Sequence, residues 1–259
     1  MTTIRSLLFN ILFALWTALI FIFSLPTLVL PRSAAWWMGG LWVRGALLLL
    51  RATVGLGHQV RGAEHRVTGP AIYAAKHQSA WDTLVLPVVL GDPAVVIKRE
   101  LLWVPFYGWY AARAGSIAID LRGGAGALRR MLADAREAAE QGRAIVIFPE
   151  GTRTAPGQTL TYQPGVAALY QALALPLVPA AVNSGLYWGR RAFVKRPGRI
   201  VLSFLEPIPP GLPRREVMAE LETRIETATA GLEREAVEGD ISPKISSGSG
   251  LTNYPIRTK

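Results

Sequence analysis

The sequence predicts an α/β fold: a mainly parallel sheet flanked by helices, preceded by an N-terminal membrane-associated helical segment. Short β-favouring runs alternate with helical patterns after residue 51, which is the arrangement of a mainly parallel sheet with covering helices. Before that point the chain is strongly apolar. We therefore expect a membrane-associated segment over residues 1–51, an α/β domain over residues 52–238 and a disordered tail over residues 239–259, where Ser, Gly and Lys follow one another without periodicity.

The N-terminal segment contains two apolar stretches. No charged residue occurs from Leu7 to Leu30, and at about 1.5 Å per residue this stretch reaches about 36 Å, enough to cross the hydrocarbon layer. The stretch from Ala34 to Leu50 carries three tryptophans but is interrupted by Arg44, so it is predicted to be an interfacial helix. Because Arg5 and Arg32 place positive charge on both sides of the first stretch, a spanning helix and a shallow hairpin in one leaflet both remain open.

A secretory signal peptide and a buried core helix are the alternatives for the first stretch. The apolar region of a signal peptide is normally about half as long, so membrane attachment is the interpretation that we adopt. Cysteine is absent, which fits a reducing compartment. We expect the domain that follows to lie on the cytoplasmic face of the membrane.

The globular part is predicted to contain six strands and three principal helices. Each strand is a short run rich in β-favouring residues and bounded by Gly, Pro or charge. The runs are Ala71–Ala75, Ala94–Lys98, Ser116–Ile119, Ala144–Phe148, Leu177–Val182 and Ile200–Leu205. The helices have apolar residues at three- and four-residue steps. They cover Leu128–Ala139 with a stop at Gly142, Val166–Leu175 with a stop at Pro176, and Glu216–Glu235.

Composition restricts the possible partners. The formal net charge of +10 favours anionic partners such as phospholipid headgroups, phosphorylated metabolites or nucleic acid. Lys and Arg are dispersed in pairs rather than gathered on one strip with aromatic residues between, so nucleic acid is not expected. Without cysteine, and with only His58 and His65 besides the histidine described next, we expect neither a metal site nor a cofactor. These two histidines are predicted to be loop residues.

His77 and Asp82 form a His-x-x-x-x-Asp element where one apolar run ends and the next begins. If His77 ends the strand or loop and Asp82 lies in the first turn of a helix, the carboxylate can orient the imidazole and raise its basicity, leaving the second ring nitrogen to take a proton. The alternative is a helix cap, because residues 79–82 fit a capping box. The two roles are compatible.

A second motif follows the predicted strand that ends at Phe148. Glu150, Gly151, Thr152 and Arg153 begin a turn rich in hydrogen-bond donors. The planar guanidinium of Arg153 suits a phosphate, Gly151 allows close approach of the backbone, and Thr152 adds a hydroxyl. An ordinary turn with a Glu150–Arg153 surface ion pair is the alternative.

Lys98 ends another predicted strand and is a further candidate for a phosphate ligand, with a solvated loop as the alternative. An aromatic cluster follows it and is open to three interpretations: an acyl channel, lipid contact or core packing. The cluster consists of Trp103, Phe106, Tyr107 and Trp109.

In combination these motifs resemble the 1-acylglycerol-3-phosphate acyltransferase family of glycerolipid synthesis. The resemblance covers residues 71–185 and rests on four blocks in the family's order. They are the His77–Asp82 element, the Lys98-Arg99-Glu100-Leu101 block, the motif from Phe148 to Arg153, and the apolar block Val178-Pro179-Ala180-Ala181. Gln78 stands where many members carry Asn or another small polar residue.

The resemblance implies transfer of an acyl chain from acyl-CoA or acyl-carrier protein to the sn-2 hydroxyl of lysophosphatidate, which gives phosphatidate. His77 would be the general base and Asp82 its orienting partner, without an acyl-enzyme. Arg153 and Lys98 would hold the acceptor phosphate in a pocket shaped by Glu150 and Gly151. An acyltransferase for another lyso-lipid, a non-catalytic membrane-surface protein and a metal-dependent phosphohydrolase are the alternatives.

Overall fold

The computed structural model describes residues 1–120 and 123–241 and contains a seven-stranded sheet with the order β1-β7-β6-β2-β5-β3-β4. Neighbouring strands are parallel except β6 and β7. The prediction of a mainly parallel sheet flanked by helices is therefore confirmed. The strands are β1 (Leu56–Arg61), β2 (Ile72–Ala75), β3 (Ala94–Lys98), β4 (Ile117–Ile119), β5 (Ile145–Ile147), β6 (Leu177–Val182) and β7 (Gly198–Phe204).

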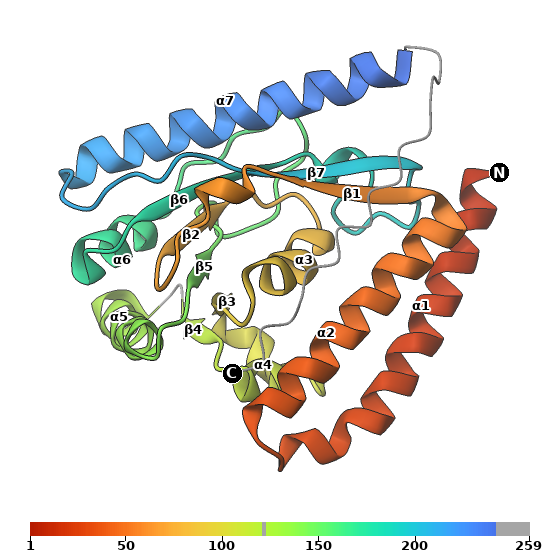
Figure 1. Ribbon diagram of the computed structural model, residues 1–259, viewed down its shortest axis with the longest axis horizontal. Helices are drawn as coiled ribbons and strands as arrows, with labels where there is room; N and C mark the ends of the chain where they lie inside the picture. Colours follow the sequence, from red (N-terminus) through yellow and green to blue (C-terminus); the bar gives the residue numbers. More distant parts are fainter. Residues whose placement is uncertain (121–122, 242–259) are drawn as a thin grey trace.

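Helices cover both faces of this sheet (Figure 1). They are α1 (Thr2–Ser24), α2 (Arg32–Leu49), α3 (Ala80–Leu90), α4 (Tyr107–Arg113), α5 (Gly124–Glu140), α6 (Gly165–Leu173) and α7 (Arg214–Ile241). The three principal helices predicted from the sequence correspond to α5, α6 and α7. Helix α7 continues two residues past Gly239, and the remainder of the expected tail, residues 242–259, lies outside the described residues.

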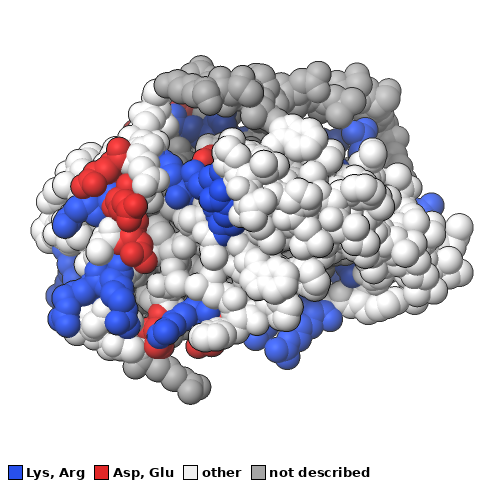
Figure 2. Space-filling view, turned by 90° about the horizontal axis from the view of Figure 1, so that it is seen from below, with Lys and Arg blue, Asp and Glu red and all other residues white. Residues whose placement is uncertain are grey.

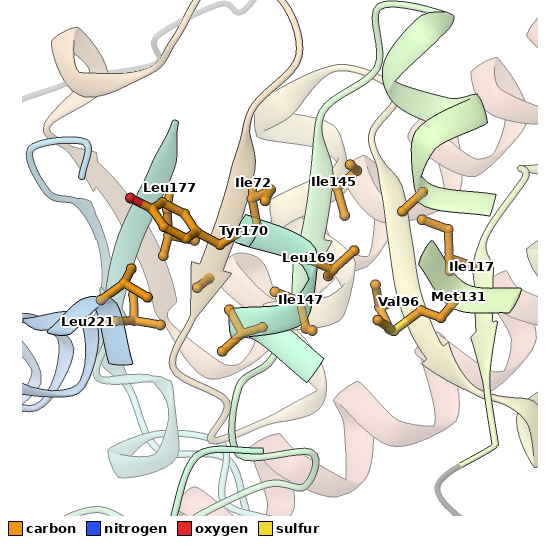
Figure 3. Close-up of a cluster of buried hydrophobic side chains, with 14 of the residues drawn as sticks. Ile72, Val96, Ile117, Met131, Ile145, Ile147, Leu169, Tyr170, Leu177 and Leu221 are labelled. Carbon is orange, nitrogen blue, oxygen red and sulfur yellow. The ribbon is translucent and has the colours of Figure 1, made fainter. Parts of the chain in front are cut away.

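The strands bury side chains on both faces, and β2 shows which helices cover which face. Ile72 and Ala74 belong to the core formed with α5, α6 and α7, part of which is drawn in Figure 3. Ala71, Tyr73 and Ala75 belong to the core formed with α1 and α3. Because successive side chains of a strand point to opposite faces, even-numbered residues of β2 face α7 and odd-numbered residues face α3.

Helices α1 and α2 form an N-terminal hairpin, joined by a 3-10 turn at Leu25–Leu28. The indole of Trp16 donates to the Trp42 carbonyl at 2.9 Å. The absence of a side chain at Gly45 allows this contact, since a Cβ there would lie 2.3 Å from the Trp16 ring. Phe9 is completely buried in the core on the α3 side. The hairpin therefore packs against the α/β domain.

The outer side of α1 is apolar and exposed. Residues 2–28 are long and apolar enough to cross a membrane by length and composition, with only 17% of the most apolar window buried. The exposed apolar residues of the helix include Ile4, Leu7, Leu8, Ile11, Leu15, Leu19, Ile22 and Phe23. In the view of Figure 2 the half of the molecule towards the hairpin is mostly uncharged, whereas the other half carries most of the visible Lys, Arg, Asp and Glu. This surface is suited to contact with lipid.

One predicted loop residue is placed differently by the structure. His58 was expected in a loop, but it lies in β1, beside β7, and its ring packs 5.7 Å from that of Trp81. Burial, and secondarily the charge of Arg51, lowers the pKa of His58. The loop prediction for His58 is wrong because the run Leu56–Arg61 mixes Gly, His, Gln and Arg with apolar residues, which hides the edge strand.

Candidate active site at the carboxyl edge of the sheet

Four neighbouring parallel strands bring the candidate residues to one edge of the sheet. The order β6-β2-β5-β3 places their carboxyl ends side by side. Lys98 ends β3, His77 follows β2, the Glu150 motif follows β5 and Ser184 follows β6. Ligands of open α/β sheets bind at this edge, so the sequence motifs that are about 70 residues apart share one region.

His77 faces α3, as the alternation along β2 requires. Its Nδ1 lies 3.0 Å from Oδ2 of Asp82. On its other side the ring stacks on Phe148, with the centroids 4.1 Å apart. The side chain is 12% exposed. A carboxylate only accepts hydrogen bonds, so Nδ1 carries the proton of the neutral ring and Nε2 keeps a free lone pair.

Asp82 is fixed more firmly than its histidine partner. Ser79 is the N-cap of α3, and Asp82 occupies the third helical position and completes a capping box. Its Oδ2 accepts from the backbone N–H groups of Gln78 at 2.7 Å and Ser79 at 2.8 Å, and its Oδ1 accepts from the hydroxyl of Ser184 at 2.6 Å. The carboxylate therefore caps the helix and contacts the imidazole at once, so the two roles considered for Asp82 are compatible in the structure.

Glu150 is buried beneath His77. Its Oε1 accepts from Nζ of Lys76 at 2.7 Å, and its Oε2 accepts from the backbone N–H of His77 at 3.2 Å. The side chains of Glu150 and Lys76 are 0% and 1% exposed. The surface ion pair between Glu150 and Arg153 that was considered above is replaced by this buried pair with Lys76.

The C-terminal helix α7 completes the buried network. Both carboxylate oxygens of Glu226 lie 2.8 Å from Nζ of Lys76. Glu226 also accepts from the Tyr162 hydroxyl at 2.8 Å and the Thr159 hydroxyl at 3.1 Å. Burial, followed by the charge of Glu226, raises the pKa of Tyr162, so the phenol stays protonated and donates.

Lys76, Ser184 and Glu226 were not predicted from the sequence to belong to the site. The alternation of β2 is the signal that indicates the direction of Lys76, since it continues the face of Ile72 and Ala74 towards α7. Ser184 follows a buried strand at the same edge. No local pattern identifies Glu226, because its partner lies 150 residues away in the chain.

The predicted phosphate ligands Lys98, Gly151, Thr152 and Arg153 are more accessible to solvent than Asp82 and Glu150, and we call them the rim of the site. Gly151 adopts a φ of 67°, a conformation that favours glycine. Thr152 and Arg153 are half-buried and Lys98 is exposed. Within the described part of the chain, neither Arg153 nor Lys98 has a salt-bridge partner. Both cations are therefore available to an anion from solution.

The aromatic cluster lies against the end of the N-terminal hairpin. Phe106 stacks on Phe21 of α1 with the centroids 5.4 Å apart, and it also contacts Trp109. Trp103, Phe106, Tyr107 and Trp109 are all exposed, Trp103 by 77%. Of the three interpretations offered above, packing in the core does not describe these side chains.

Among residues 1–120 and 123–241 no group of three or more His, Cys, Asp or Glu side chains is arranged to hold a metal ion. The site consists of an imidazole in contact with a buried carboxylate, and Lys98 and Arg153 lie at or beyond the ends of the neighbouring strands β3 and β5.

Comparison with known proteins identifies the family of the chain. The acyltransferase family profile matches residues 57–183. The 1-acyl-sn-glycerol-3-phosphate acyltransferase of Pseudomonas aeruginosa is 37% identical over 202 residues, which cover 76% of this chain and 77% of that protein. The 1-acyl-sn-glycerol-3-phosphate acyltransferase alpha of Mus musculus is 34% identical over 62% of this chain and 59% of its own length.

A solved structure has the same fold. The 1-acyl-sn-glycerophosphate (LPA) acyltransferase PlsC from Thermotoga maritima superposes with a TM-score of 0.74, covering 90% of this chain and 98% of that one at 21% identity. At this identity the likeness concerns the fold. The relatives of higher identity and the matching profile lead to one conclusion: the chain belongs to the acyltransferase family of enzymes and is a relative of the 1-acyl-sn-glycerol-3-phosphate acyltransferases.

Proposed function

We propose that this enzyme transfers an acyl chain from a thioester to the sn-2 hydroxyl of 1-acylglycerol 3-phosphate, forming phosphatidate, with His77 as the general base. The observation that carries the proposal is the Nδ1–Oδ2 contact of 3.0 Å between His77 and Asp82. It leaves Nε2 as the proton acceptor at the carboxyl edge of the sheet. The names of the relatives supply the acceptor, since they are 1-acyl-sn-glycerol-3-phosphate acyltransferases.

The reaction requires one proton transfer in each direction. Nε2 of His77 takes the proton of the sn-2 hydroxyl as its oxygen attacks the thioester carbonyl. The tetrahedral intermediate then breaks its C–S bond, and the imidazolium returns the proton to the departing thiolate. Asp82 stabilises the imidazolium between these steps. A placed base of this kind contributes about 10²–10⁴-fold, and the alignment of the two substrates supplies much of the remainder.

The acceptor phosphate is assigned to the cations on the rim. Arg153 provides a fork of N–H donors and Lys98 a point charge. Gly151 and Thr152 lie in the same turn as Arg153, where close backbone approach and a hydroxyl add to the binding of a phosphate. Both carboxylate oxygens of Glu150 accept hydrogen bonds, one from Lys76 and one from the backbone of His77. Glu150 therefore links the turn that carries Arg153 to the segment that carries His77.

Membrane attachment completes the proposal. The exposed apolar side of α1 and the aromatic side chains around α4 are assigned to the lipid, and the catalytic domain is assigned to the cytoplasmic face. The acceptor carries an acyl chain of its own, so an enzyme held at the bilayer meets it without extracting it fully into water. Acyl-CoA and acyl-carrier protein are the two candidate donors.

The test is product formation by the purified full-length protein in detergent. Lysophosphatidate is incubated with labelled acyl-CoA or acyl-carrier protein, beside glycerol 3-phosphate and other lyso-phospholipids as acceptors. We expect phosphatidate with at least one donor, and a higher kcat/KM for lysophosphatidate than for the other acceptors. The absence of phosphatidate with both donors would contradict the proposal, and a preference for another acceptor would reassign the substrate.

A further inference from the structure

The residues on both sides of His77 are attached to α7. Lys76 and Gln78 are buried, and they point away from α3, on the face of the sheet that α7 covers. Their partners Glu226 and Glu233 are seven residues apart, which is about two helical turns and keeps them on one side of the helix. Figure 1 shows α7 as one long helix along this side of the sheet.

The first attachment is an ion pair whose ammonium group is buried. Lys76 is bound by Glu150 and by both oxygens of Glu226, and its Nζ also donates to the Gln158 carbonyl at 3.1 Å. The Lys76 side chain is 1% exposed and that of Glu226 is 21% exposed. One ammonium between two carboxylates leaves a negative charge, which the hydroxyl groups of Tyr162 and Thr159 stabilise by donating to Glu226.

The second attachment uses a neutral side chain. Nε2 of Gln78 donates to Oε1 of Glu233 at 2.7 Å, and Oε1 of Gln78 accepts from the backbone of Gly185 at 3.0 Å. The other carboxylate oxygen of Glu233 accepts from the backbone of Gly157 at 3.0 Å. Gln78 thereby connects α7 to the segment after β6 that carries Ser184.

We propose that Glu226 and Glu233 are positioning residues, through which α7 holds the backbone on either side of His77 and so fixes the place of its imidazole. The inference rests on the proposed function, in which His77 is the base. Asp82 fixes the orientation of the ring, whereas the two glutamates fix the segment from which the ring projects. Displacing a catalytic group by about 1 Å can cost about 10²-fold in rate. Loss of the contacts with α7 should therefore lower kcat more than it changes the KM values.

Kinetics of four variants test the proposal. Glu226→Ala and Glu233→Ala each remove one attachment, and Glu226→Gln keeps an acceptor for Lys76. Glu238→Gln is the matched control, because Glu238 lies exposed on the same helix and has no hydrogen bond or ion pair within the described residues. The melting temperature of each variant is measured first, and kcat and both KM values are then determined well below it.

We expect kcat to fall about tenfold in each alanine variant while both KM values change by less than about threefold. Glu226→Gln should recover most of the loss, and Glu238→Gln should match the parent. If the alanine variants melt at lower temperature but retain a kcat within about twofold of the parent, α7 only stabilises the fold and the proposal is wrong. Should Glu226→Ala fail to fold, Glu233→Ala and Glu226→Gln still decide it.

A spectroscopic measurement separates this inference from the proposed reaction. The chain has three histidines, so the ring resonances of a histidine-labelled sample can be assigned by single substitutions. Loss of either attachment should shift or broaden the Cε1–H resonance of His77 and leave that of His65 in place. Unchanged His77 resonances in both alanine variants would refute the hold by α7, even if no phosphatidate were formed by the parent enzyme.

Discussion

Two sets of cations lie at the same edge of the sheet and differ in their surroundings. Lys76 is 1% exposed and lies between the carboxylates of Glu150 and Glu226. Arg153 and Lys98 belong to the rim, and within the described residues neither has a salt-bridge partner. A cation that is already neutralised and dehydrated has nothing to offer a phosphate, whereas an accessible unpaired one does. Burial and pairing therefore distinguish a cation that is used within the protein from one that is free to bind a phosphate.

The largest effect is expected where the paired cation is removed. Lys76→Met leaves Glu150 and Glu226 facing each other without a counter-ion, and breaking a buried pair in this way typically costs about 3–5 kcal/mol. We expect a loss of this size in the free energy of unfolding measured with urea. Lys98→Met is the matched control and should leave the unfolding midpoint in place. A stable Lys76→Met protein would mean that the buried carboxylates take up protons or water at little cost.

Removing the unpaired arginine should affect binding rather than stability. Charge-assisted hydrogen bonds contribute about 1.5–3 kcal/mol, so Arg153→Ala should raise the KM for lysophosphatidate by about tenfold or more. The KM for the acyl donor and the urea midpoint should stay near the parent values. Arg129→Ala, which removes an exposed arginine of α5, provides the control. Equal increases in both KM values would remove Arg153 from the phosphate site.

A smaller effect is expected at the hydroxyl that supports Asp82. The Ser184 hydroxyl donates to Oδ1 of Asp82 at 2.6 Å, and Ser184→Ala removes one of the hydrogen bonds that fix this carboxylate. We expect kcat to fall by about three- to tenfold, equivalent to about 1 kcal/mol, with an unchanged KM for lysophosphatidate. Ser184→Thr, which keeps the hydroxyl, should retain more of the activity than Ser184→Ala. The reverse order would show that packing at this position matters more than the hydrogen bond.

The smallest effect is expected at the most exposed cation. Lys98 projects from the end of β3 into solvent, where salt at about 0.1 M limits the range of its attraction for a phosphate to about 10 Å. Lys98→Ala should raise the KM for lysophosphatidate by only about two- to threefold, and the difference from the parent should vanish at high ionic strength. A salt-independent increase comparable with that of Arg153→Ala would instead place Lys98 in direct contact with the acceptor phosphate, where salt does not screen it.

The sequence predicts the fold of this chain well because its local patterns agree with its tertiary structure. The runs at residues 71–75, 94–98 and 177–182 are apolar and lie between helical patterns, and each is a strand in the structure. The contact between His77 and Asp82 was also foreseeable, since a helix beginning at Ser79 brings the carboxylate back to the ring. Each of these features depends on residues that are close in the chain.

What the sequence did not reveal depends on distant pairing. His58 belongs to a mixed polar run that becomes a strand because β7 lies beside it, about 140 residues further along the chain. A lysine at the end of a strand is usually solvated. Lys76 is buried because the carboxylates of Glu150 and Glu226, which are distant in the sequence, lie next to its ammonium group. These partners are brought together by the pairing of distant strands and by the packing of α7 on the sheet, and spacing along the chain does not identify them.

Replacing His77 shows whether its imidazole is the base of the acyl transfer. Initial rates of phosphatidate formation are measured for the parent, for His77→Ala and for His65→Ala, which removes a histidine outside the site. We expect kcat of His77→Ala to fall about 10²–10⁴-fold, with both KM values within about threefold of the parent and His65→Ala unchanged. An equal kcat for the parent and His77→Ala would contradict the assignment of the base.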